Sequence, residues 1–124
     1  MYKLLVLDLD GTLTNSKKEI PEHNLNTLLR AQEKGLRIVL ASGRPTYGIT
    51  PLAEQLQLER FGGYILSFNG GQIIDCQTNK VIYETVLDPA HYDYLYEQGN
   101  TDDFKIISYE DNYIVGEDIE NEYI

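Results

Sequence analysis

Near its start the chain reads Lys3-Leu4-Leu5-Val6-Leu7-Asp8-Leu9-Asp10-Gly11-Thr12, a short apolar run that ends in a polar segment containing glycine. Such a run is typical of a strand that is buried on both faces, and strands of this kind occur mainly in parallel sheets. The segment therefore predicts a first core strand over residues 3–9 and an α/β fold.

The residues that follow predict a strand, helix, strand unit. Leucines recur at helical spacing between Pro21 and Gly35, which predicts a helix over residues 22–34, and a second apolar run predicts a strand over residues 36–41. Because such crossovers are almost always right-handed, the two strands are expected to be parallel, with their carboxyl ends at one edge of the sheet. Open α/β sheets bind ligands at that edge. Residues 46–58 are apolar on one side but contain a glycine and a proline, which predicts a broken helix.

A third parallel strand is predicted over residues 64–67, and a hairpin follows it. Asn69-Gly70 provides a turn, and the short apolar runs over residues 72–75 and 81–83 are spaced as the two strands of a hairpin. The expected core is therefore a Rossmann-like α/β unit with a hairpin after its third parallel strand.

Charge is distributed unevenly, and the change marks a domain boundary. Residues 1–83 carry 8 acidic and 9 basic side chains, a net charge of +1, whereas residues 84–124 carry 12 acidic and one basic, a net charge of -11. We therefore predict two domains, the first part of a core over 1–83 and a second domain that begins at 84. In the second, a helix is expected after Asp88-Pro89, and two strands over 104–109 and 113–115.

The composition excludes several classes of function. The 124 residues include 20 acidic side chains, 10 basic ones and a single cysteine, with a net charge of -10. One cysteine excludes an internal disulfide framework and a cysteine-based zinc site, which fits a cytoplasmic protein. The negative charge argues against a nucleic-acid partner, because phosphate backbones attract clustered lysine and arginine. No apolar run approaches the ~20 residues of a membrane helix, so we expect no membrane partner.

The two aspartates that follow the first strand carry the strongest chemical signal. Two carboxylates two residues apart at a strand end can face one pocket, and Gly11 lets main-chain amides approach an anion. Carboxylates held side by side repel each other unless a cation lies between them, and Mg²⁺ prefers one or two carboxylates together with phosphate oxygens. One aspartate can then attack phosphorus while the other acts as general acid and base.

Asp8-Leu9-Asp10-Gly11-Thr12-Leu13 resembles the first motif of the haloacid dehalogenase superfamily of phosphohydrolases. Leu40-Ala41-Ser42-Gly43-Arg44-Pro45 is similar to the second motif in its Cof-type branch, whose serine or threonine binds the phosphoryl group. The resemblance implies that Asp8 and Asp10 are the catalytic residues and the Mg²⁺ ligands. It also implies that phosphate is bound by Gly11, Thr12, Ser42 and Gly43. Arg44 would reach toward the phosphate or the leaving group as a planar donor.

The resemblance extends past the third predicted strand. Ser67-Phe68-Asn69-Gly70-Gly71-Gln72-Ile73 is similar to the segment of the Cof-type branch whose asparagine and glycine line the pocket near the substrate. It implies a substrate-binding role for Asn69 and Gly70; a plain hairpin turn is the alternative. In this branch an α/β cap domain is inserted after the hairpin, so residues from 84 onward are expected to begin that cap.

Two further motifs of the family have no clear counterpart. The family's third motif is a lysine, but Lys80 and Lys105 are expected to be surface charges, and residues 116–122 only faintly resemble the acidic fourth motif. We therefore expect a truncated chain that is inactive alone. Lys17 and Lys18 are expected in a solvated loop, or alternatively facing an anionic substrate.

The sequence thus predicts a Mg²⁺-dependent phosphohydrolase of small phosphorylated metabolites, most simply sugar phosphates, that acts through an aspartyl-phosphate intermediate. Two alternatives stay open, a non-catalytic binding module on the same fold and a phosphomutase of the same superfamily. The sequence does not distinguish hydrolysis from mutase transfer, and it does not identify the ester or the oligomeric state.

Overall fold

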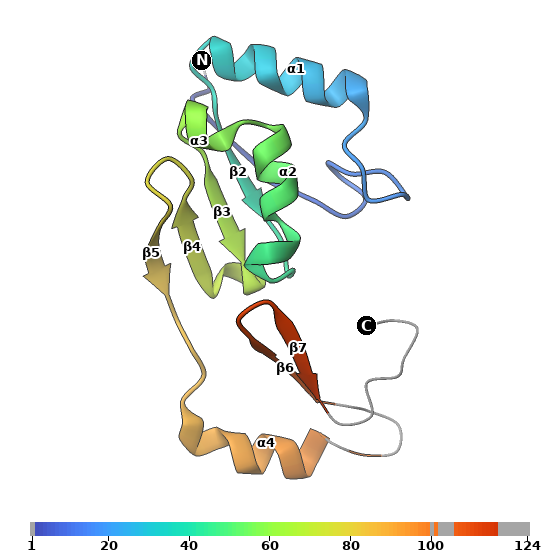
Figure 1. The fold of residues 1–124 in the computed structure, drawn as a ribbon, viewed down its shortest axis with the longest axis vertical. Helices are drawn as coiled ribbons and strands as arrows, with labels where there is room; N and C mark the ends of the chain where they lie inside the picture. Colours follow the sequence, from blue (N-terminus) through green and yellow to red (C-terminus); the bar gives the residue numbers. More distant parts are fainter. Residues whose placement is uncertain (1, 100, 102–105, 117–124) are drawn as a thin grey trace. The chain divides into compact units, whose positions relative to one another are not determined.

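The structure is a computed structural model that describes residues 2–99, 101 and 106–116 (Figure 1). The chain divides into two compact units, Met1–Thr85 and Val86–Ile124. None of the described helices has the length and apolarity needed to cross a membrane.

The N-terminal unit contains one five-stranded sheet with the strands in sequence order. The first three strands are parallel to one another, and the last two form an antiparallel hairpin, so the sheet is mixed. The strands are β1 (Leu4–Asp8), β2 (Arg37–Ala41), β3 (Tyr64–Ser67), β4 (Gln72–Asp75) and β5 (Lys80–Glu84). The predicted α/β fold, with three parallel strands and a hairpin after the third, is confirmed.

Three helices connect the parallel strands. The connection from β1 to β2 contains α1 (Glu22–Glu33), and the connection from β2 to β3 contains α2 (Thr50–Gln55) and α3 (Leu58–Phe61) after a short 3₁₀ turn over Thr46–Gly48. The predicted break in the second connection is confirmed. A proline lies in the first turn of α2, and Gln57, with a φ of 54°, separates α2 from α3.

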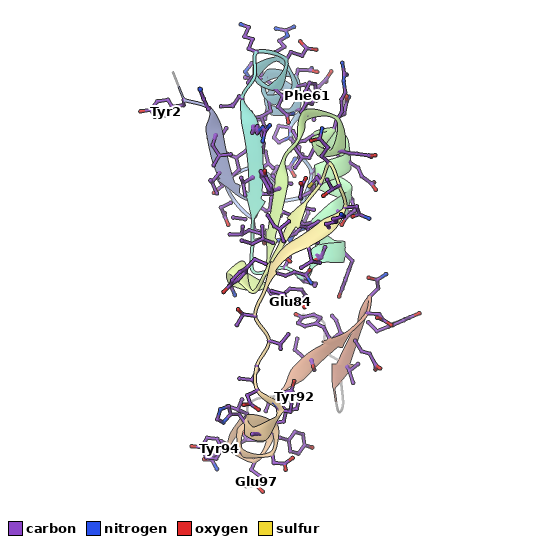
Figure 2. All side chains as sticks on the ribbon, turned by 90° about the vertical axis from the view of Figure 1, so that its left-hand side faces the viewer. Tyr2, Phe61, Glu84, Tyr92, Tyr94 and Glu97 are labelled. Atoms are coloured by element: carbon purple, nitrogen blue, oxygen red, sulfur yellow. The ribbon has the colours of Figure 1, made fainter. Side chains whose placement is uncertain are left out.

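One row of side chains runs across the sheet and fixes its register. Leu7 is paired with Leu40, Leu40 with Ile65, and Ile65 with Ile74, so these four side chains lie on one face of the sheet. They pack with apolar residues of all three helices, which therefore cover that same face (Figure 2). The helical residues in this core are Leu25, Leu28, Leu52, Ala53, Leu56 and Leu58. Because slipping by one residue would expose the whole row, the register is strongly specified.

The register aligns the carboxyl ends of the three parallel strands. Asp8 at the end of β1 is paired with Ala41 in β2, and Ala41 is paired with Leu66 in β3. The polar segments that follow these strands therefore begin at one edge of the sheet, as the sequence predicts.

The C-terminal unit begins with a capped helix. The Asp88 carboxylate accepts a hydrogen bond from the amide of Ala90 at 2.9 Å, and a 3₁₀ turn over Pro89–His91 leads into α4 (Tyr92–Gly99). A hairpin of β6 (Ile107–Glu110) and β7 (Tyr113–Gly116) follows. The expected start of the first strand at residue 104, Lys105 and the acidic stretch that follows Gly116 lie outside the described residues. None of this unit's described residues is buried.

Candidate active site

The loop after β1 is anchored by a buried leucine between the two aspartates. Leu9 is 0% exposed and belongs to the core, whereas Asp8 and Asp10 on either side of it are exposed. The Leu9 carbonyl accepts hydrogen bonds from both the amide and the hydroxyl of Thr14, at 2.9 and 3.0 Å. Gly11 turns the chain with a φ of 81°, a conformation that glycine adopts without strain. The core therefore fixes Leu9, and both carboxylates stand at the surface beside it.

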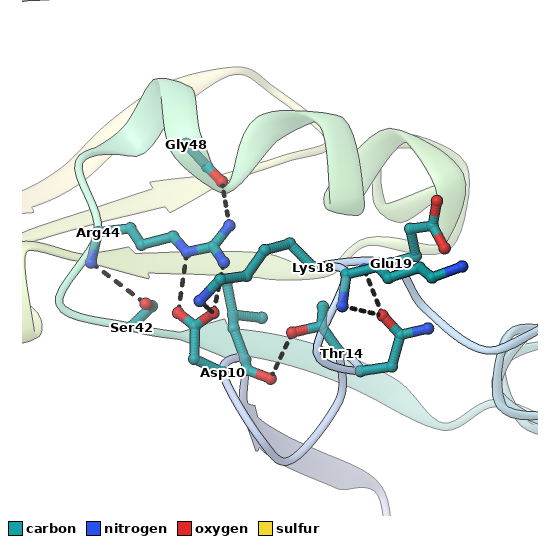
Figure 3. A network of polar contacts seen from close by, with 10 residues as sticks. Asp10, Thr14, Lys18, Glu19, Ser42, Arg44 and Gly48 are labelled. Carbon is teal, nitrogen blue, oxygen red and sulfur yellow. Dashed lines mark hydrogen bonds and ion pairs between the residues drawn. The ribbon is translucent and has the colours of Figure 1, made fainter. Parts of the chain in front are cut away.

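Asp10 is held by two cations that come from two different loops. The Arg44 guanidinium donates from Nε to Oδ2 at 2.9 Å and from Nη2 to Oδ1, while Lys18 Nζ lies 2.7 Å from Oδ1. Figure 3 shows Arg44 reaching Asp10 from the segment after β2 and Lys18 reaching it from the loop after β1. These two contacts, Arg44 first and Lys18 second, lower the pKa of the Asp10 carboxyl from 3.8 to about 2.

Asp8 has different surroundings from Asp10. No hydrogen bond or ion pair joins its carboxylate to another residue in the part of the chain that the structure describes. Its backbone carbonyl accepts a hydrogen bond from the amide of Leu13 at 3.2 Å, which fixes the main chain at the strand end. The Asp8 carboxylate is therefore exposed and free to contact an incoming group.

The loops after β2 and β3 are tied together by their main chains. The amide of Asn69 donates to the Ser42 carbonyl at 3.1 Å, and the amide of Phe68 donates to the Arg44 carbonyl at 3.0 Å. A Cβ atom at Gly43 would lie 3.0 Å from Oδ1 of Asn69, so glycine allows the two loops to approach closely. Phe68, Asn69 and Gly70 all have positive φ angles, between 52° and 92°. At Phe68 and Asn69, which carry a Cβ atom, this conformation is strained, and such strain is found preferentially at functional sites.

The structure places most of the predicted site residues at this one edge. Asp10 is joined to Arg44, Ser42 Oγ accepts a hydrogen bond from the Arg44 amide at 3.2 Å, and Asn69 lies against Gly43. Thr12 and Gly11 are exposed on the first loop, and no described side chain joins them to the second or third loop. Lys80 begins β5, in the hairpin where the sequence places it.

Lys18 is the residue of this site whose position the sequence does not predict. Lys17 and Lys18 lie in an exposed loop, as the sequence predicts, and Lys18 in addition forms an ion pair with Asp10 that the sequence does not predict. Its neighbour Asn15 is the signal for this arrangement, because asparagine side chains commonly close tight turns. The Asn15 side chain accepts hydrogen bonds from the amides of Lys17 and Glu19, at 2.9 and 3.1 Å.

The carboxylate oxygens of the site are the type of ligand that a hard cation prefers. Two exposed carboxylates next to an open loop are what Mg²⁺ uses when phosphate oxygens complete its coordination. Among the described residues, however, no group of three or more histidine, cysteine, aspartate or glutamate side chains is close enough to hold a metal ion. Asp8 and Asp10 could therefore supply some of the ligands of a Mg²⁺ ion, and other groups would have to supply the rest.

A separate groove of about 1000 Å³ lies between the second helical connection and the β4–β5 hairpin. Its lining includes Thr46, Leu58, Ile65 and Ile74, and none of the predicted site residues belongs to it. Cys76 also lines the groove, and burial raises the pKa of its thiol to about 11, so the thiol is protonated near neutral pH. The aspartate site is instead an open edge of the sheet.

Comparison with known proteins agrees with this fold. A family profile described as haloacid dehalogenase-like hydrolase matches residues 5–124. A crystal structure of a haloacid dehalogenase-like hydrolase from Bacteroides thetaiotaomicron superposes with a TM-score of 0.88 at 54% sequence identity. That superposition covers 98% of this chain and 46% of the Bacteroides chain.

Curated relatives are similar to this chain over about a third of their own length. Phosphatase YwpJ of Bacillus subtilis (strain 168) is 34% identical over 93 residues, which are 75% of this chain and 32% of that protein. The 5-amino-6-(5-phospho-D-ribitylamino)uracil phosphatase YcsE of the same organism is 35% identical over 79 residues, which are 64% of this chain and 30% of that protein. The chain thus spans about a third of these curated relatives.

Proposed function

Because the chain belongs to the haloacid dehalogenase-like hydrolases, we propose that the protein carrying it is a Mg²⁺-dependent phosphatase of small phosphorylated metabolites. The observation that supports this most directly is the edge where β1, β2 and β3 end. Asp8 ends the first strand and Asp10 follows it, Ser42 follows the second strand, and hydrogen bonds tie the third loop to the second. Paired carboxylates beside a hydroxyl and the main-chain amides of glycine residues suit phosphoryl transfer.

In the proposed reaction Asp8 is the nucleophile. Its free carboxylate oxygen attacks phosphorus, the bond from phosphorus to the ester oxygen breaks, and Asp10 donates a proton to the departing oxygen. In the second step Asp10 takes a proton from water as that water attacks the aspartyl phosphate. The bond between phosphorus and Asp8 then breaks, which releases inorganic phosphate and restores both carboxyl groups to their starting forms.

The other residues would position the ester. Ser42 and Thr12 would donate hydroxyl hydrogen bonds to the phosphoryl oxygens, together with the amides of Gly11 and Gly43. Arg44, Asn69 and Gly70 would face the substrate. Asp8 and Asp10 would hold Mg²⁺, whose positive charge, when bound, offsets the negative charge of the phosphoryl oxygens.

Asp10 has to change its protonation state during this reaction. In the free protein Arg44 and Lys18 keep its pKa near about 2, so it is a carboxylate at neutral pH. A carboxylate can accept the proton of the second step but cannot donate the proton of the first. Asp10 therefore has to take up a proton, from the phosphate monoester or from water, before it can act as the acid, and weaker contacts with Arg44 and Lys18 would favour that uptake.

We also propose that sugar phosphates are the main substrates. We further propose that residues 84–124 form the start of an inserted cap domain. The change of charge at residue 84 and the division of the chain into units after Thr85 support a separate cap. The 124-residue chain alone, which spans about a third of its curated relatives, is expected to have little or no activity.

The experiment is to measure phosphate release by the full-length protein from a panel of sugar phosphates and simpler esters, with Mg²⁺ and with a chelator. We expect turnover for at least one ester in the range of about 1 to 1000 per second, and its loss with the chelator. Isomerised sugar phosphate without phosphate release would identify a mutase instead. Tight binding of an ester without any reaction would identify a binding module, and either result would overturn the proposal.

A further inference from the structure

We propose that Lys18 selects among substrates, favouring phosphate esters whose leaving group carries a second negative charge next to the ester oxygen. This inference rests on the proposed phosphatase function and adds the chemistry of the leaving group. It follows from where Lys18 lies, how its loop is built and how many charges surround Asp10.

The first argument is position. In the proposed reaction the ester oxygen has to come within hydrogen-bond distance of Asp10, which protonates it. Lys18 Nζ lies 2.7 Å from Oδ1 of that same carboxylate. A carboxylate or phosphate one or two bonds from the ester oxygen would therefore come within reach of the Lys18 ammonium group, whereas the ring hydroxyls of a neutral sugar would gain much less from it.

The second argument is that the loop holds Lys18 in place at some cost. Lys18 has a φ of 63°, a left-handed conformation that residues with a Cβ atom seldom adopt. Four hydrogen bonds impose it. Two go to the Asn15 side chain, the Lys18 amide donates to the Asn15 carbonyl at 3.0 Å, and the Asn15 amide donates to the Glu19 carbonyl at 2.9 Å. The turn therefore fixes the main chain from which the Lys18 side chain reaches Asp10.

The third argument is charge. Asp10 carries one negative charge and receives two cations, so the three side chains together carry a net charge of +1. The excess cation is accessible, because the Lys18 side chain is 65% exposed and the Arg44 side chain 25%. An incoming anion can therefore take over the Lys18 contact.

The test compares two esters that differ at one group, 2-phosphoglycolate, which carries a carboxylate, and ethyl phosphate, which carries a methyl group at that position. The ratio of their kcat/KM values is measured for the full-length protein and for three variants. Lys18→Met removes the charge, Lys18→Arg keeps it, and Lys17→Met removes a neighbouring lysine as a matched control. We expect Lys18→Met to lower the preference for 2-phosphoglycolate about fivefold, the effect of one solvent-exposed ion pair.

The other two variants and the salt dependence test whether the charge of Lys18 causes the preference. Lys17→Met should keep the wild-type ratio, Lys18→Arg should restore most of it, and the ratio should shrink as salt is raised, because exposed charges are screened. A Lys18→Met ratio equal to that of the wild type, or an equal loss in Lys17→Met, would overturn the proposal. Changes of kcat alone, equal for both esters, would also count against it.

A binding measurement separates this inference from the proposed phosphatase function. Each ester is titrated into the 124-residue chain while the amide resonances of residues 15–19 are followed by NMR. Tighter binding of 2-phosphoglycolate than of ethyl phosphate, with the difference lost in Lys18→Met, would support the role of Lys18 even if the full-length protein hydrolyses neither ester. Equal binding of both esters, or no change in the difference in Lys18→Met, would refute it.

Discussion

The end of β1 and the loop that follows it carry one aspartate each, and the two side chains have opposite surroundings. Asp8, the last residue of the strand, has no partner among the described residues, whereas Asp10 has two cations on its carboxylate. Leu9, buried between them, keeps both at the surface. The spacing of the two aspartates in the sequence does not predict this difference between their surroundings.

The difference suits two roles. A nucleophile needs an unoccupied oxygen that can approach phosphorus, and Asp8 has one. A general base has to be deprotonated, and Arg44 and Lys18 keep Asp10 a carboxylate at neutral pH by lowering its pKa to about 2. Pairs of titratable groups with contrasting surroundings are a common sign of divided chemical roles.

The largest effect is expected from removing the free carboxylate. Asp8→Asn in the full-length protein should lower kcat for phosphate release by about 10⁴-fold or more, as loss of a nucleophile does in other enzymes. Circular dichroism controls for folding, and Asn69→Ala serves as the comparison at the same edge, with a smaller loss. A variant that retains a tenth of the wild-type rate would show that the free carboxylate is not the nucleophile.

The next effect concerns the residue that keeps the two aspartates apart. Leu9→Ala would leave a cavity in the core and should lower the free energy of unfolding of the chain by about 2–5 kcal/mol, measured by urea denaturation. Val86→Ala is the control, because Val86 is 74% exposed and its loss should change stability little. Equal effects of the two substitutions would show that Leu9 does not anchor the site.

A smaller effect is expected when the main partner of Asp10 is removed. Arg44→Met should raise the pKa of Asp10 from about 2 toward 3.8, measured by NMR titration of its carboxyl carbon. Because the folded pKa is lowered, the contact stabilises the fold above about pH 4, and that contribution is lost as the pH falls toward about 2. Stability should therefore depend less on pH in this interval in the variant. An Asp10 pKa that stays at about 2 in Arg44→Met would show that Arg44 is not the main cause of the lowered pKa.

The smallest effect belongs to the exposed lysine. Lys18→Met should also raise the pKa of Asp10, but by less than Arg44→Met does, because Lys18 is the second of the two contacts in strength. The difference from the wild type should diminish in 1 M salt, where the screening length is about 3 Å. Lys17→Met should leave the titration unchanged. An Asp10 pKa shift in Lys17→Met as large as that in Lys18→Met would show that the effect comes from the net charge of the loop and not from the contact of Lys18 with Asp10.

The elements that place the site could be predicted from the sequence because they follow from repeating patterns. Apolar runs identify β1, β2 and β3, leucine spacing identifies α1, and the crossover rule brings the three strand ends to one edge. The sequence therefore predicts Asp8, Ser42 and Asn69 at that edge. A resemblance of short motifs added the chemistry they are expected to perform.

The contact between Lys18 and Asp10 could not be predicted in this way. It depends on the φ of one residue and on an asparagine side chain that closes a turn of five residues, and neither has a periodic pattern. The pairing of Asp10 with Arg44 spans 34 residues and needs both loops in their final conformations. The motif favours a phosphate as the partner of Arg44, whereas the structure shows a carboxylate.

The most direct test of the contrast between Asp8 and Asp10 is to locate the phosphoryl group after a single turnover. The full-length protein is mixed with Mg²⁺ and an ester that it hydrolyses, and the reaction is quenched in acid. The protein is then digested, and the peptide that contains both aspartates is sequenced by mass spectrometry. We expect a phosphoryl group on Asp8, accumulating further in Asp10→Asn because the second step then lacks its base. A phosphoryl group on Asp10, or none on either residue while phosphate is released, would contradict the account.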